Sequence, residues 1–170
     1  IALTFAEQAP PLLRGRALTV LGRLAMWQGD YAGMHGPMNE AVSLLRPLGD
    51  SASLAYALHG LGIATGFLGD VSAARRLIDE AAAMIADPPE ALQVWIEYWR
   101  GLVEEWDRDI DAAYQAYERA LRIARQLGHR TAIAHSLAVL GRLAAATGNH
   151  VVGVNALAES LRVFLDHEDR

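Results

Sequence analysis

The chain has 170 residues, 52% of them hydrophobic and only 7% aromatic, and a formal net charge of −5. It has no cysteine, which excludes disulfides, thiolate catalysis and cysteine-based zinc sites. Acidic and basic residues are interspersed without a basic block, so we expect no direct contact between this segment and nucleic acid.

A glycine in a predicted helix, followed by a tight turn, recurs along the chain. These glycines are Gly22, Gly62, Gly101 and Gly141, at spacings of 40, 39 and 40 residues. The turns after them read Gly29-Asp30, Gly69-Asp70, Arg108-Asp109 and Gly148-Asn149. A fixed period of this size is typical of an array of helix hairpins, in which each repeat buries its apolar side against its neighbours.

Apolar residues at spacings of three and four predict two helices in each repeat. In each turn the glycine suits the left-handed end of a helix, and Asp30, Asp70, Asp109 and Asn149 suit the N-cap of the next. Gly36 and Pro37 predict a kink or a restart in the second helix. The expected helices span residues 11–28, 31–47, 51–68, 71–86, 88–106, 110–127, 131–147 and 150–166.

The period also predicts the organisation of the chain. Residues 1–9 align with the end of a second helix, so we interpret them as the remnant of a preceding repeat. Residues 10–170 form the repeat domain, and we expect the chain to be a fragment of a longer protein. The four repeats are expected over about 11–49, 51–87, 88–128 and 130–167.

The pattern resembles tetratricopeptide (TPR) repeats, which have a Leu-Gly pair in the first helix, a Gly-Asp or Gly-Asn turn and alanines along the second helix. The resemblance implies an all-α, right-handed superhelix of four hairpins. The chain departs from the common pattern in its longer period, in Glu104 at a small-residue position, and in Met34 with Pro37. Among longer-period arrays it resembles the repeat segment of LuxR-type, maltose-activator-like ATP-dependent bacterial transcription regulators.

In arrays of this family the first helices line the concave surface. Counting from each helix glycine predicts which side chains face this groove, and the charges in this set give +2, from three arginines and one glutamate. Trp and Tyr provide large contact areas with few rotors, which suits binding of an apolar or aromatic ligand or a peptide carrying a carboxylate or phosphate. The same rings could instead pack as core between repeats. The candidate groove residues are Arg16, Arg23, Trp27, Tyr56, His59, Phe67, Trp95, Tyr98, Glu105, Trp106, His135 and Arg142.

Catalysis has little support in the sequence. No two of the six histidines have the three- or four-residue spacing that places metal ligands on one helix face, and we expect no metal and no cofactor. Glu104 and Glu105 are better explained as a solvated helix end than as an acid–base pair. All 15 basic residues are arginine, so no phosphate-binding loop with a lysine is present.

The sequence therefore favours a non-catalytic module that binds a protein, a peptide or a small anionic or aromatic effector, within a cytoplasmic bacterial regulator or signalling protein. No membrane span is expected, because the longest uncharged stretch, 51–69, carries polar residues and four glycines. The alternative is a scaffold or homodimerisation module without a small ligand. Leu3, Phe5, Leu161 and Phe164 are the candidate contacts for such self-association.

Overall fold

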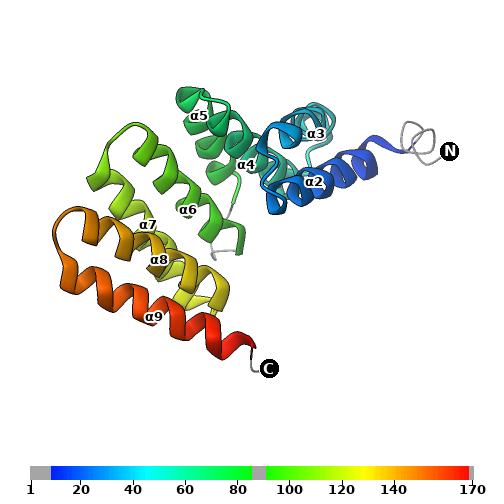
Figure 1. Ribbon diagram of the computed structural model, residues 1–170. Helices are drawn as coiled ribbons and strands as arrows, with labels where there is room; N and C mark the ends of the chain where they lie inside the picture. Colours follow the sequence, from blue (N-terminus) through cyan, green and yellow to red (C-terminus); the bar gives the residue numbers. More distant parts are fainter. Residues whose placement is uncertain (1–8, 86–90, 169–170) are drawn as a thin grey trace. The chain divides into compact units, whose positions relative to one another are not determined.

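The computed structural model describes residues 9–85 and 91–168, and this part of the chain is helical without strands (Figure 1). The expected all-α fold is confirmed, and four of the eight predicted helices, α2, α4, α7 and α8, begin and end within one residue of their predicted bounds. The expected remnant at residues 1–9 lies outside the described residues except for Ala9, as does the predicted start of a helix at 88. The helices are α2 (Pro11–Trp27), α3 (Tyr31–Leu45), η1 (Arg46–Leu48), α4 (Ser51–Phe67), α5 (Val71–Ala83), α6 (Ala91–Trp106), α7 (Ile110–Gln126), α8 (Arg130–Ala146) and α9 (His150–Glu168).

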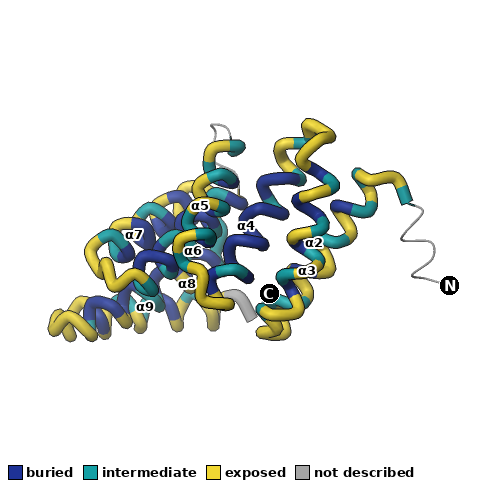
Figure 2. The backbone as a smooth tube through the Cα atoms, turned by 90° about the horizontal axis from the view of Figure 1, so that it is seen from above, coloured by how far each residue is buried: buried dark blue, intermediate teal, exposed yellow. Residues whose placement is uncertain are grey.

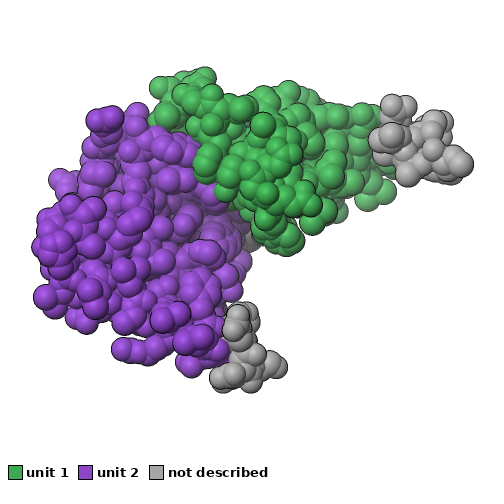
Figure 3. Space-filling view, in the orientation of Figure 1, with its two compact units in different colours: residues 1–86 green, residues 87–170 purple. Residues whose placement is uncertain are grey.

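Consecutive helices pack as four hairpins, which pair α2 with α3, α4 with α5, α6 with α7 and α8 with α9. Two hairpins form each of two compact units, residues 1–86 and 87–170 (Figure 3). Within each unit the second helix of the first hairpin also packs on the first helix of the next, as α3 does on α4 and α7 on α8. Each unit is thus a stack of two hairpins with its own core.

The turns between helices follow one design. A glycine with positive φ ends a helix at Gly29, Gly69 and Gly148, and Arg108 takes the same left-handed conformation, at φ 64°, in the third hairpin. The following aspartate then caps the next helix by accepting a hydrogen bond from a backbone amide. The three caps expected at aspartates are confirmed, with Oδ1 2.8 Å from the Gly33 amide at Asp30, 2.8 Å from the Ala73 amide at Asp70 and 3.0 Å from the Ala112 amide at Asp109.

The repeated glycines lie where the two helices of a hairpin approach most closely. A Cβ added at Gly62 would lie 2.8 Å from Cγ1 of Ile78, and one at Gly101 would lie 2.6 Å from the ring of Tyr117. In all four hairpins the side chain beneath the glycine comes from the residue sixteen positions further along the chain. The glycines are therefore equivalent, as the period predicts. The partners are Met38, Ile78, Tyr117 and Leu157.

The expected restart in the second helix is wrong, because α3 continues from Tyr31 to Leu45 with Pro37 inside it. A proline in a helix removes one hydrogen bond and crowds the turn before it. That turn contains Gly33 and Gly36, whose backbones adjust more freely than those of other residues. The α-helix ends instead just before Pro47, which lies in the short 3₁₀ helix that follows.

An ion pair between second helices occupies the same place in both units. Arg46, in η1 at the end of α3, pairs with Glu80 of α5, and Arg125 of α7 pairs with Glu159 of α9 at 2.8 Å. Both pairs span 34 residues and lie at the surface. Exposed pairs of this kind contribute about 1 kcal/mol or less, so they fix the register of neighbouring hairpins more than they stabilise the fold.

Burial follows the stacking within a unit. The helix α4 contacts α3 and α5 and is buried along most of its length, whereas the described residues of α2 and α9 are mostly exposed or half-buried (Figure 2). Alanines occupy the second-helix crossing points predicted from the sequence, and Ala41, Ala81 and Ala120 are fully buried. Glu104, at the position where other first helices have a small residue, is also buried.

The glycine contacts predict a matched pair of variants in the first unit. Gly62→Ala would press against Ile78 and the carbonyl of Ala74, which cannot move without shifting α5. We expect it to lower the free energy of unfolding by about 1–3 kcal/mol, as overpacked cores do. Gly22→Ala meets the flexible side chain of Met38, and alanine favours the helix by up to about 1 kcal/mol, so its loss should be smaller.

Urea unfolding followed by circular dichroism measures both variants. Equal losses for the two, or a gain at Gly62, would show that the crossing distance does not limit this position.

Candidate functional site

The predicted face of the first unit comes from α2 and α4, and its first arginine is occupied. The guanidinium of Arg16 donates to Asp50 Oδ2 at 2.6 Å and to Ser53 Oγ at 2.9 Å. The hydroxyl and amide of Ser53, together with Arg16, hold the pKa of the Asp50 carboxyl below its usual value. Arg16 thus ties α2 to the N-terminus of α4, and its charge is balanced.

Arg23 lies in a different environment on the same helix. Its guanidinium carbon is 5.8 Å from the ring centroid of Trp27 and 5.9 Å from that of Tyr56. Both distances allow cation–π attraction. Trp27 is 70% exposed, and among the described residues no carboxylate pairs with Arg23. A cation close to two rings, one of them exposed to solvent, is the combination expected of a binding surface.

Two other candidates of the first unit contact neighbouring residues: His59 is buried within the unit, and Phe67 stacks on another ring at its surface. His59 is only 8% exposed, because α4 is enclosed by its neighbours. The ring of Phe67, at the end of α4, stacks on Tyr31 with centroids 3.6 Å apart and planes 9° apart. The exposed candidates of this unit are therefore Arg16, Arg23, Trp27 and Phe67, and Tyr56 is half-buried close to Arg23.

In the second unit the predicted aromatic residues contact one another. The ring of Trp95 lies edge-on to those of Tyr98 and His135, with both centroid distances 5.8 Å. His135 also meets Phe164 of α9 at 5.4 Å, and burial in this group lowers the pKa of its imidazole. Trp95 and Tyr98 pack against the core cluster between α6, α7 and α8. These rings thus have a packing role, the second of the two interpretations open from the sequence.

Glu105 is the centre of a hydrogen-bond network on the same face. It accepts from the hydroxyl of Tyr117 at 2.6 Å and from the guanidinium of Arg142, which is 2.7 Å from each carboxylate oxygen. The Glu105 carboxylate raises the pKa of Arg142, and burial with the same carboxylate raises that of Tyr117. The positive charge of Arg142 is therefore balanced by the negative charge of Glu105. Trp106 is half-buried beside it.

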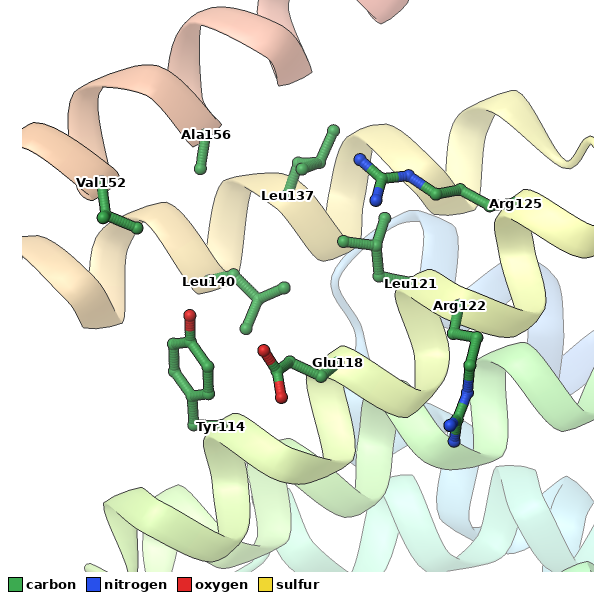
Figure 4. A pocket seen from close by; sticks show the side chains of 9 residues that line it. All are labelled: Tyr114, Glu118, Leu121, Arg122, Arg125, Leu137, Leu140, Val152 and Ala156. Atoms are coloured by element: carbon green, nitrogen blue, oxygen red, sulfur yellow. The ribbon is translucent and has the colours of Figure 1, made fainter.

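Sequence reasoning missed a pocket on the second helices. It has a volume of about 280 Å³ and lies between α7, α8 and α9, away from the predicted face. In Figure 4 the Tyr114 hydroxyl and the Glu118 carboxylate point toward Leu140, and the Arg125 guanidinium lies near Leu137. The lining residues come from three helices, and no motif in the sequence indicates that they lie together.

Other chemistry is limited in the part of the chain that the structure describes. No three His, Asp or Glu side chains there gather closely enough to hold a metal ion. None of the helices described is both long and apolar enough to cross a membrane.

The hairpins and their stacking define the class of fold: the chain has the fold of TPR-like helical repeat proteins. No family model matches the sequence, and none of the curated proteins compared with it matches.

Solved structures with the same fold are distant in sequence. BtubC (BKLC) from P. vanneervenii superposes with a TM-score of 0.79 at 18% identity, over 99% of this chain and 71% of that one. The TPR-like repeats of a putative kinesin light chain from Podosopora anserina give 0.66 at 16% identity, over 92% and 77%. MamA gives 0.64 at 20% identity, over 92% and 81%.

The environment of His135 predicts a pH dependence of stability. Because burial lowers its pKa, the unfolded chain binds this proton more readily than the folded one. Stability contributed at this site is present above the pKa of an unfolded histidine, about 6.5, and declines as the pH falls below it. In urea titrations at neutral and mildly acidic pH, His135→Gln should lose less stability on acidification than the unmodified chain.

His150→Gln, at the exposed start of α9, is the matched control. A pH dependence that is the same in all three proteins would contradict the assignment to His135.

Proposed function

We propose that the chain is a non-catalytic module that binds a protein or peptide through the first helices of its hairpins. The surface formed by Arg23, Trp27 and Tyr56 is the primary contact, and its ligand is an acidic or carboxylate-bearing peptide with an apolar side chain. The observation that carries this proposal is that the guanidinium of Arg23 lies within 6 Å of the ring centroids of both Trp27 and Tyr56, with no carboxylate among the described residues paired to it.

The other groove arginines do not offer the same chemistry. Arg16 and Arg142 are already bonded to Asp50 and Glu105, so a ligand carboxylate would have to displace a protein one. The guanidinium N–H groups of Arg23 are not paired with a carboxylate of the described residues, so they can donate to a ligand. Trp27 provides an exposed apolar surface beside them. An anionic group at Arg23 and an apolar side chain on Trp27 would satisfy both.

The second unit has a supporting role in this proposal. Trp95 and Tyr98 hold the packing of α6 on α7 and α8, while Trp106 and the Arg142–Glu105 pair present polar and aromatic edges. The wider setting remains part of the proposal: a cytoplasmic bacterial regulator of the LuxR-type, in which ligand binding favours one arrangement of the repeats and so biases attached effector domains. This regulatory setting is supported only by the Leu-Gly-Asp turns at residues 48–50 and 68–70.

Selection from a random peptide library tests the binding surface, with peptides displayed so that their C-termini are free. We expect enrichment of acidic residues or a free terminal carboxylate next to an apolar residue. In fluorescence anisotropy, Arg23→Leu should weaken a selected peptide about tenfold or more, because a charged hydrogen bond contributes about 1.5–3 kcal/mol. Trp27→Ala should weaken it as well.

Arg76→Leu is the control, because it removes the same charge from an exposed position on α5 of the same unit. Enriched peptides without acidic groups, or equal binding by Arg23→Leu and the unmodified chain, would contradict the proposal. An unchanged affinity with the effector domains attached would contradict the regulatory setting alone.

A further inference from the structure

The pocket of about 280 Å³ in the second unit combines apolar side chains from three helices with polar ones from α7 alone (Figure 4). It is internal to the unit, because α8 packs on both α7 and α9. Pockets for drug-sized ligands begin at about 300 Å³, so this one suits a smaller molecule or a single side chain. Its apolar lining consists of Leu121, Leu137, Leu140, Val152 and Ala156.

One polar side chain of this pocket is an acid without a partner. Glu118 and Arg122 lie four residues apart on α7 with the acid first, which is the favourable order for an ion pair on a helix. Among the described residues, however, neither of them is paired. Figure 4 shows the Glu118 carboxylate and the Tyr114 hydroxyl facing Leu140, while the guanidinium of Arg122 extends away from them. The carboxylate can therefore accept hydrogen bonds from a group in the pocket.

The cation at the other end of the pocket is already balanced. Arg125 donates to the Glu159 carboxylate of α9 at 2.8 Å. The unmatched charge that faces the apolar lining is thus the negative charge of Glu118. A ligand that complements the pocket would carry one positive group and an apolar chain.

The first unit has the equivalent groove without this combination. The matching ion pairs Arg46–Glu80 and Arg125–Glu159 place equivalent positions of the two units 79 residues apart. Two leucines of the lining are retained, but a neutral amide replaces the acid and a leucine replaces the alanine. The equivalent residues are Leu58 for Leu137, Leu61 for Leu140, Asn39 for Glu118 and Leu77 for Ala156.

We propose that the pocket binds a singly charged ammonium group on a short aliphatic chain, as in a free alkylamine or a lysine side chain. The ammonium donates to the Glu118 carboxylate and the Tyr114 hydroxyl, and the chain lies on Leu137 and Leu140. A second positive charge on the ligand would be repelled by the arginines at the rim. This site lies in the other unit from Arg23 and selects the opposite charge, so it is independent of the peptide-binding surface proposed above.

Titration of the ¹⁵N-labelled whole chain, followed by NMR chemical shifts, tests the proposal with pentylammonium as the probe. We expect saturable shifts at amides of α7, α8 and α9 in the millimolar range, and no such shifts with pentanoate, which has the same chain length and the opposite charge. Methylammonium should bind much more weakly, because each buried methylene tightens binding about fourfold.

Two variants of α7 test the sign of the charge. Glu118→Gln should weaken pentylammonium about fivefold or more, because it removes the charge that pairs with the ammonium. Arg122→Gln, one turn further on, removes a repelling cation and should tighten binding slightly. A ligand that binds as an anion would show these two effects exchanged.

Ala156→Leu tests the space in the pocket. It should abolish binding and leave the fold intact, because the first unit carries Leu77 at the equivalent position, and circular dichroism checks the fold. Nα-acetyl-lysine methylamide distinguishes the two sources of the ligand: tighter binding than pentylammonium identifies a lysine of a protein, and weaker binding identifies a free amine. Absence of saturable shifts with pentylammonium, or equal binding by Glu118→Gln and the unmodified chain, would overturn the proposal.

Discussion

The close contact between the two helices of each hairpin is the constraint on which the structure depends. At Gly62 and Gly141 the facing helix is so near that a Cβ would meet a side chain or a backbone carbonyl within 2.9 Å. Because the partner is always sixteen residues away, the contact fixes both the length of the turn and the rotation of each helix about its axis. That rotation decides which side chains of a first helix face outward.

The third hairpin shows how this constraint reaches the candidate site. The ring under Gly101 belongs to Tyr117, and its hydroxyl binds Glu105, one helical turn after the glycine. Glu105 in turn binds Arg142 of the next hairpin. The crossing point and the polar network on the first-helix face are therefore one connected structure, and the other hairpins, with Met38, Ile78 and Leu157 in this position, lack it.

The period and the turn residues were enough to predict the fold, because each glycine and each capping aspartate acts locally. Of the kink or restart predicted at Pro37, the restart was wrong, because the cost of the proline depends on the flexibility of the turn before it, and the sequence pattern did not take that into account. The binding face was predictable only in part. Periodicity places Arg16 and Arg142 on it, but their carboxylate partners lie 34 and 37 residues away in the sequence, and only packing brings them together.

His59 and Trp27 show the same limit in opposite directions. Both are on first helices at positions expected to face the groove, yet His59 is buried because α4 packs against both α3 and α5. Trp27 comes at the end of α2, where the helix stops and no later residue covers the ring. How far a predicted face is open depends on how many neighbours its helix has.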